Sequence, residues 1–167
     1  MSTWQKIKRG IKITLAASGV FLAALLCHQP TVYPPPLPIE QVAPTEWVTT
    51  NVFHDSVTVD GKQYSITIKP GFSFDMASIP KRLEIDGITR DTPAIRRGAL
   101  LHDALFRSHS LDMDVANQIL YQCCLDDGMV KEKADAVFEA VSAWSWVAWD
   151  SVTPESVVTA RGLVSVR

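Results

Sequence analysis

Three side chains that can move protons, Asp75, His102 and Asp103, lie in stretches of the chain that are otherwise mostly apolar. Aromatic and aliphatic residues surround Asp75 between positions 72 and 79, and they surround the adjacent His102 and Asp103 between positions 99 and 106. Burying a carboxylate or an imidazole costs several kcal/mol unless a partner satisfies it. These residues must therefore be satisfied by one another, by backbone groups, or by a metal ion or substrate, which indicates a polar site.

The predicted helix that carries His102 places it on an apolar face with Ile95, Ala99 and Leu105, at three- and four-residue spacing. Because histidine titrates near neutral pH, His102 is a candidate general base or metal ligand. The structural alternative is a core histidine bonded to a backbone carbonyl or a carboxylate. Asp103 lies about 100° around the helix from His102, so the two side chains can converge on an ion or a water. The alternative for Asp103 is an ion pair with an arginine of the same helix.

Two further carboxylates are candidates for the same site. Asp114 falls in the first turn of the next predicted helix, and a short connection would bring it near His102 if the two helices are antiparallel. Its alternative role is that of a helix-end carboxylate that favours the helix dipole. Asp75 precedes a turn-like stretch, residues 77–80, whose backbone N–H groups its carboxylate could cap instead.

The composition is that of a folded protein without a strong charge. The chain has 167 residues, of which 47% are hydrophobic and 20% charged, and its formal net charge is −2. This length accommodates one compact domain with an appendage. The charge provides no basic field for nucleic acid, so we expect no nucleic-acid partner.

The N-terminal residues have the pattern of an export signal. Four basic residues at positions 6–12 precede an apolar run over residues 13–27 that has no small-residue cleavage site. We predict an uncleaved signal anchor over residues 1–29 that contacts the membrane through residues 11–27; a cleaved signal, a lipoprotein and a soluble leader are the alternatives. The positive-inside rule then places the domain on the extracytoplasmic (periplasmic) side of a bacterial inner membrane. Six prolines within residues 30–45 predict a stiff, extended linker.

The middle of the chain predicts a β-hairpin. Asp60-Gly61 is a favoured type I′ turn pair, and apolar and polar residues alternate on either side of it. A two-residue loop pairs Phe53 with Ile68 at the open end, which puts the apolar side chains on one face. Residues 72–74 can add a short third strand.

Three helices are predicted next, over residues 92–107, 112–128 and 131–149, where capping residues precede apolar residues at helical spacing. The expected fold class is α+β: a small antiparallel β-sheet packed on about three α-helices, preceded by one N-terminal membrane helix. The globular domain is expected over residues 46–153, followed by a C-terminal tail, residues 154–167, without assigned structure.

Three motifs together resemble a phage and prophage family classed as domain of unknown function 1353. They are G-F-x-x-D-x-A-S-I-P from residue 71, L-H-D-x-L-F-R from residue 101 and D-x-A-N-x-I-L-Y from residue 114. Ser73 stands where threonine is usual in that family, and Ala104 where tyrosine is usual. The resemblance implies a viral or prophage origin and brings no established activity.

The helix with His102-Asp103, followed by a helix bearing Asp114, is also similar to the core of prokaryotic phospholipases A2. In that family an H-D-x-x-Y helix supplies a histidine base and a calcium-binding aspartate. The similarity implies that His102 deprotonates water, that Asp103 binds Ca²⁺ and that Asp114 orients His102. We expect Asp75 to belong to the same catalytic site. The chain departs from that family in having Phe106 in place of the tyrosine and no cysteine beside the histidine.

Two functions follow as hypotheses. In the first, the chain is a phage- or prophage-encoded, membrane-tethered accessory protein whose His/Asp site is hydrolase-like, metal-assisted and directed at envelope lipid or at ester or amide bonds. In the second, it is a noncatalytic accessory or virion-associated protein that binds a phage or host envelope protein. The polar residues are then caps and buried ion pairs.

Overall fold

The computed structural model of the chain describes residues 36–76, 84 and 87–167. The predicted membrane segment, residues 30–35 of the predicted linker and the turn-like stretch 77–80 lie outside the described residues. Among the described residues, no helix is both long enough and apolar enough to span a bilayer. The described residues belong to one compact unit, Val32–Arg167.

The architecture is α+β, as predicted, with two three-stranded antiparallel sheets and four helices in the part of the chain that is described. One sheet has the strand order β1-β2-β5 and the other β3-β4-β6. In chain order the elements are β1 (Ile39–Ala43), β2 (Glu46–Thr49), β3 (Phe53–Val59), β4 (Lys62–Ile68), β5 (Ser73–Phe74), α3 (Pro93–Ser108), α4 (Met113–Asp126), α5 (Lys131–Asp150), α6 (Pro154–Leu163) and β6 (Val164–Val166).

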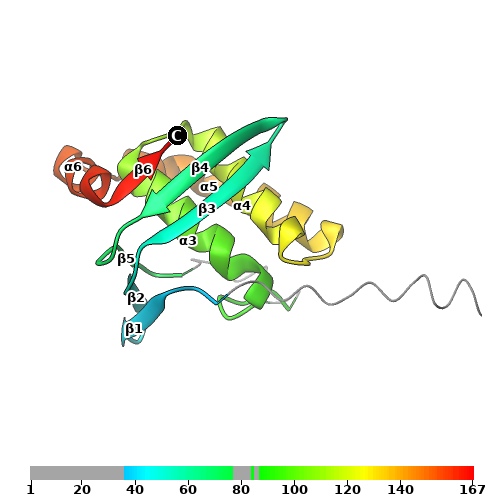
Figure 1. Cartoon of the computed structure of the whole chain (residues 1–167). Helices are drawn as coiled ribbons and strands as arrows, with labels where there is room; N and C mark the ends of the chain where they lie inside the picture. Colours follow the sequence, from blue (N-terminus) through cyan, green and yellow to red (C-terminus); the bar gives the residue numbers. More distant parts are fainter. Residues whose placement is uncertain (1–35, 77–83, 85–86) are drawn as a thin grey trace, which may run out of the picture. The chain divides into compact units, whose positions relative to one another are not determined.

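The β3–β4 hairpin confirms the predicted pairing. Phe53 lies opposite Ile68 and Val57 opposite Tyr64. Asp60 and Gly61 both have positive φ, 50° and 78°, as a type I′ turn requires. The alternation therefore buries one face of the hairpin, and Figure 1 shows this hairpin crossing in front of α3 and α4.

Two of the remaining strands, β5 and β6, pair with strands that are distant in the sequence. β5 forms at the predicted third strand, but it pairs with β2 in the other sheet and not with the hairpin. The predicted tail forms α6 and β6, and β6 pairs with the hairpin strand β4. Residues 39–43, within the predicted linker, form β1 against β2.

The three predicted helices are present as α3, α4 and α5, with ends within two residues of the predicted ones. Pro93 occupies the first turn of α3, where its missing N–H costs no hydrogen bond. After α4, the chain turns at Gly128, whose φ is 87°. α4 packs against both α3 and α5, whereas α3 and α5 contact each other little.

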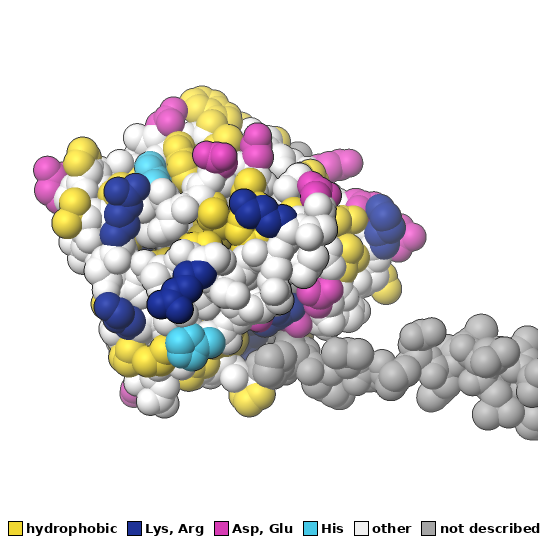
Figure 2. Space-filling model, turned by 45° about the horizontal axis from the view of Figure 1, so that its top comes forward, with side chains coloured by type: hydrophobic (Ala, Val, Ile, Leu, Met, Phe, Trp, Pro, Cys, Tyr) yellow, Lys and Arg dark blue, Asp and Glu magenta, His cyan; other side chains and the backbone are white. Residues whose placement is uncertain are grey.

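Charged side chains of both signs are scattered over the surface. On the face shown in Figure 2, lysine and arginine side chains lie among acidic, apolar and uncharged ones. This distribution agrees with a formal net charge of −2. The charges on this face therefore do not indicate a binding surface for an acidic or a basic ligand.

A glycine in α3 allows that helix to pack closely on α4. A Cβ added at Gly98 would lie 2.8 Å from Leu120 Cδ1 and 3.1 Å from Cys123 Cβ. We predict that Gly98→Ala lowers the free energy of unfolding by about 1–3 kcal/mol, because overpacking outweighs the better helix propensity of alanine. Denaturant titration measures the effect. The matched control is Gly162→Ala in α6, where the added Cβ meets nothing within 4 Å; an equal loss in both variants would contradict the packing argument.

Candidate functional site

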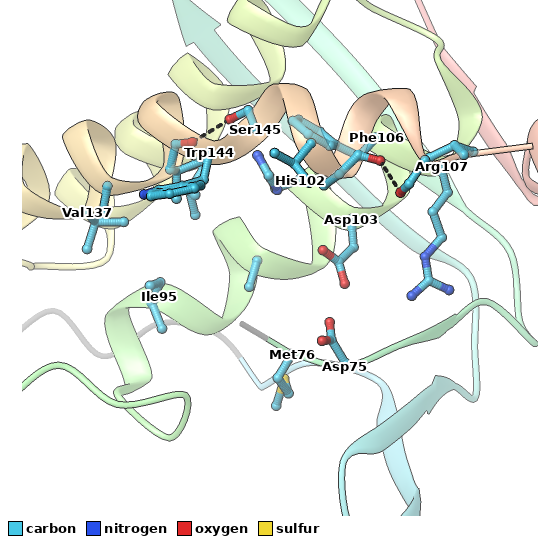
Figure 3. Close-up of a pocket in the computed structure, with 18 residues that line it drawn as sticks. Asp75, Met76, Ile95, His102, Asp103, Phe106, Arg107, Val137, Trp144 and Ser145 are labelled. Atoms are coloured by element: carbon cyan, nitrogen blue, oxygen red, sulfur yellow. Dashed lines mark hydrogen bonds between the residues drawn. The ribbon is translucent and has the colours of Figure 1, made fainter. Parts of the chain in front are cut away.

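A pocket of about 590 Å³ opens between α3 and the C-terminal half of α5, with the end of β5 and α4 completing its lining. Most of the lining is apolar. The polar side chains in it are Asp75, His102, Asp103, Arg107, Ser145 and Ser151. The structure therefore brings three of the four predicted site residues, Asp75, His102 and Asp103, to one cavity (Figure 3).

His102 is held in one orientation by a hydrogen bond and by an aromatic ring. Its Nε2 lies 2.9 Å from Asn117 Oδ1, and its ring stacks on Phe106 with the centroids 4.0 Å apart. Burial lowers the pKa of His102 to about 4, although the Asn117 hydrogen bond opposes this shift. The ring is therefore neutral at physiological pH. With the proton on Nε2 donated to Asn117, Nδ1 keeps its lone pair and forms no hydrogen bond to a described residue.

Asn117 connects the three helices that surround His102. It is buried on α4, and its Oδ1 also accepts a hydrogen bond from Ser145 Oγ of α5 at 3.1 Å. Ser145 Oγ is also within 2.6 Å of Val141 O, one turn earlier in α5. Because the buried Asn117 Oδ1 is within hydrogen-bond distance of side chains on both α3 and α5, Asn117 has little freedom to rotate and fixes the orientation of the His102 ring.

The structure does not bring Asp114 to this site. Asp114 is exposed in the first turn of α4 and does not line the pocket. Asn117, one turn further along α4, forms the bond to His102 that was predicted for Asp114. The sequence contained a signal for Asn117, because it lies beside Ala116 on the apolar stripe of α4 and within the D-x-A-N motif.

Asp103 and Asp75 form a pair of carboxyl groups at one end of the pocket. The two side chains point toward each other in Figure 3, with Arg107 beside them. Burial, and then the negative charge of Asp75, raise the pKa of Asp103 well above its usual range, and the Arg107 guanidinium only partly opposes this. Asp103 therefore keeps its proton to a higher pH than an ordinary aspartate does. Its Oδ2 is buried and has no hydrogen-bond partner among the described residues.

The arginine predicted as an alternative partner of Asp103 has another main contact. Arg107 Nη1 donates to the Ser73 carbonyl at 2.7 Å, and its guanidinium lies 5.6 Å from the centre of the Phe72 ring. Arg107 thus attaches α3 to β5, directly before Asp75. Asp75 is followed by Met76, a buried non-glycine residue with a φ of 69°. This strained conformation is held by packing and sets the direction in which the chain leaves Asp75.

The carboxyl pair provides few ligands for a metal ion. Among the described residues, no group of three or more histidine, cysteine, aspartate or glutamate side chains is arranged to hold one. Ca²⁺ takes about six to eight oxygen ligands, and backbone carbonyls or waters would have to supply most of them here. The two carboxyl groups can instead share a proton, which the raised pKa of Asp103 favours.

The fold and the pocket together define an α+β domain with a histidine and a carboxyl pair in an apolar cavity. The chain belongs to the family described as "Protein of unknown function (DUF1353)", which it matches over residues 50–141. That match confirms the family resemblance, and it spans Asp75, His102, Asp103 and Asn117. No curated protein and no solved structure matches the chain.

Proposed function

We propose that this domain hydrolyses an ester or amide bond in the pocket, with His102 as the general base and Asp103 as the acidic group. One observation carries the proposal: a neutral histidine, whose Nδ1 forms no hydrogen bond to a described residue, lines the same cavity as a buried carboxyl group with a raised pKa. Two titratable groups whose surroundings push their pKa values apart are typical of the acid and the base of an active site.

The reaction can be written from these residues. His102 Nδ1 removes a proton from water as the water oxygen attacks the carbonyl carbon of the substrate. The Asp103 carboxyl group donates a hydrogen bond to the oxygen that gains negative charge, as a protonated aspartate in an apolar site can do. When the tetrahedral intermediate collapses, the bond to the leaving group breaks, and the proton on Nδ1 transfers to that group.

The setting is part of the same proposal. We propose a phage- or prophage-encoded accessory protein that is tethered to the membrane through residues 11–27, with its domain on the extracytoplasmic side. The basic residues followed by an apolar run support the tether, and the motifs of the family resemblance support the origin. Lipids and other esters of the bacterial envelope would then be within reach of the pocket.

Asn117 provides a test that separates positioning from chemistry. We predict that Asn117→Ala lowers turnover by about 100-fold, because the His102 ring loses its fixed orientation. Asn117→Asp should instead place a negative charge beside His102 and raise its pKa, which shifts the acidic limb of the pH–rate profile upward. Both effects are measured from pre-steady-state and steady-state rates of ester hydrolysis. The rates are taken between roughly pH 3 and 9, a range that includes the ordinary pKa values of aspartate and histidine side chains. The control is Gln118→Ala, the next residue of α4, which does not line the pocket; unchanged profiles in both Asn117 variants would contradict the positioning role.

A calcium ion between Asp75 and Asp103 is the second candidate, because the two carboxyl groups face each other. In that case Ca²⁺ would polarise the carbonyl of the substrate in place of the shared proton. Calorimetric titration of the full chain with Ca²⁺ separates the two. Saturable binding that is lost in Asp103→Asn supports the ion, and absence of binding supports the shared proton. If the chain hydrolyses no ester either with or without Ca²⁺, the noncatalytic accessory protein becomes the favoured function.

A further inference from the structure

We infer that the pocket binds the alkyl part of a single-chain acyl group, with the bond to be cleaved at the carboxyl pair. This inference rests on the proposed function, because it names the substrate class of the same site. It comes from the arrangement of polar and apolar side chains along the cavity, which is independent of the chemistry assigned to His102.

The pocket is polarised along its length. Figure 3 shows Ile95 and Val137 at one end, Asp103, Asp75 and Arg107 at the other, and His102 between them. Leu120 and Ala140 add further aliphatic lining, and both are almost completely buried. A ligand that matches this cavity has an alkyl portion and a polar group at one end.

The aliphatic end is unsuited to sugars and peptides. These ligands carry hydrogen-bonding groups along their whole length, and each such group loses its water in the pocket without gaining a partner among aliphatic side chains. A cavity of about 590 Å³ is within the range of small-ligand pockets. An alkyl chain loses nothing by leaving water, and each buried methylene contributes to affinity.

The pocket has an apolar mouth on α5. Trp144 and Val147 line the pocket and have exposed fractions of 61% and 47%. Ala148 lines it as well and is also exposed. Residues 137, 141, 144 and 148 recur at helical spacing, so one face of α5 runs from the buried end to this mouth. An alkyl chain can therefore enter along this mostly apolar face of α5.

The test measures binding of the full chain to uncharged alcohols, which carry no bond to hydrolyse. The dissociation constant should tighten roughly threefold for each added methylene from n-butanol to n-octanol, until the cavity is filled. Cyclododecanol, a compact ring, should bind at least tenfold more weakly than n-dodecanol. Affinity that is independent of chain length, or equal affinity for the ring and the chain, would overturn the inference.

Two alanines of α5 provide a matched pair of variants. Ala148 and Ala143 are both exposed, but only Ala148 lines the pocket. Ala148→Phe should weaken n-octanol binding at least tenfold, whereas Ala143→Phe should leave it unchanged. Equal losses in the two variants, or no loss in Ala148→Phe, would show that the alcohols bind elsewhere.

The result is distinguishable from failure of the proposed function. Alcohol binding that depends on chain length, in a wild-type protein that hydrolyses no ester, would retain the alkyl site and remove the catalytic proposal. Hydrolysis that is equally fast for butyryl and octanoyl esters, together with alcohol binding that does not depend on chain length, would remove the alkyl site and retain the catalysis.

Discussion

Replacing His102 by glutamine is expected to lower the hydrolysis of an uncharged acyl ester by about 10²–10⁴-fold, the contribution that a general base typically makes. Glutamine is polar and similar in reach, so it can keep a hydrogen bond to Asn117, but its amide does not accept a proton near neutral pH. The fold should therefore survive while the base is lost. The measurement is the initial rate with the wild type and the variant at equal concentration and pH.

The control for this variant is His54→Gln. His54 lies on the exposed strand face of the hairpin, where its Nδ1 is 2.9 Å from Thr67 Oγ1, and it does not line the pocket. We expect wild-type rates from it. Rates in His102→Gln that match the wild type would remove His102 from the mechanism, and equal losses in both variants would point to a general effect of the substitution.

The pH dependence follows from the same two groups. His102 must be neutral to act as a base, so the rate should rise through its pKa of about 4 as the pH increases. Asp103 must be protonated to donate its hydrogen bond, so the rate should fall again through the raised pKa of that carboxyl group. The expected profile is bell-shaped, and both limbs belong to the pocket.

Replacing Arg97 by methionine is expected to lower the free energy of unfolding by about 3–5 kcal/mol, the usual cost of breaking a buried ion pair from one side. Arg97 on α3 has only 10% of its side chain exposed. Its Nη1 is 2.8 Å from Asp55 Oδ2, and its Nε is 3.0 Å from each oxygen of Asp127. Methionine fills similar space but leaves Asp127, whose side chain is 5% exposed, without its charged partner.

Denaturant titration of matched variants tests this ion pair. Lys131→Met removes an exposed pair with Asp135, 2.7 Å apart, and should change stability little. Adding Asp127→Leu to Arg97→Met should recover part of the loss, because no unpaired charge then remains at that position. A small effect of Arg97→Met alone, similar to that of Lys131→Met, would show that water satisfies Asp127 and that the ion pair is not an important contributor.

The parts of the fold that were predictable are those determined locally. The hairpin follows from Asp60-Gly61 and the alternation on either side, and α3 follows from Pro93 and the apolar spacing after it. β5 and β6 were not predictable in their pairing, because strands of two and three residues carry almost no periodicity. Their partners, β2 and β4, are distant in the sequence, so only the folded structure identifies them.

The site was predictable to a similar degree. Proton-handling residues in apolar stretches identified His102, Asp103 and Asp75, and the structure brings all three to the pocket. The residue that bonds to His102 was expected to be Asp114, because a short connection would bring it near His102 and because the phospholipase A2 similarity implies an aspartate on the next helix in that role. The two residues lie on nearly the same face of α4, so their position along the helix decides the outcome. Asn117 is buried one turn further along, whereas Asp114 in the first turn stays in solvent. Spacing alone does not show which of the two turns lies beside His102.

The most direct test of the account is an NMR titration of the histidine side chains in the ¹⁵N-labelled full chain, with His102→Gln used to assign the signal. The account predicts that the His102 ring stays neutral down to a pH of about 4 and carries its proton on Nε2, bonded to Asn117. Titration near the ordinary histidine value, or a neutral ring with its proton on Nδ1, would contradict it, because His102 would then have no free lone pair facing the pocket.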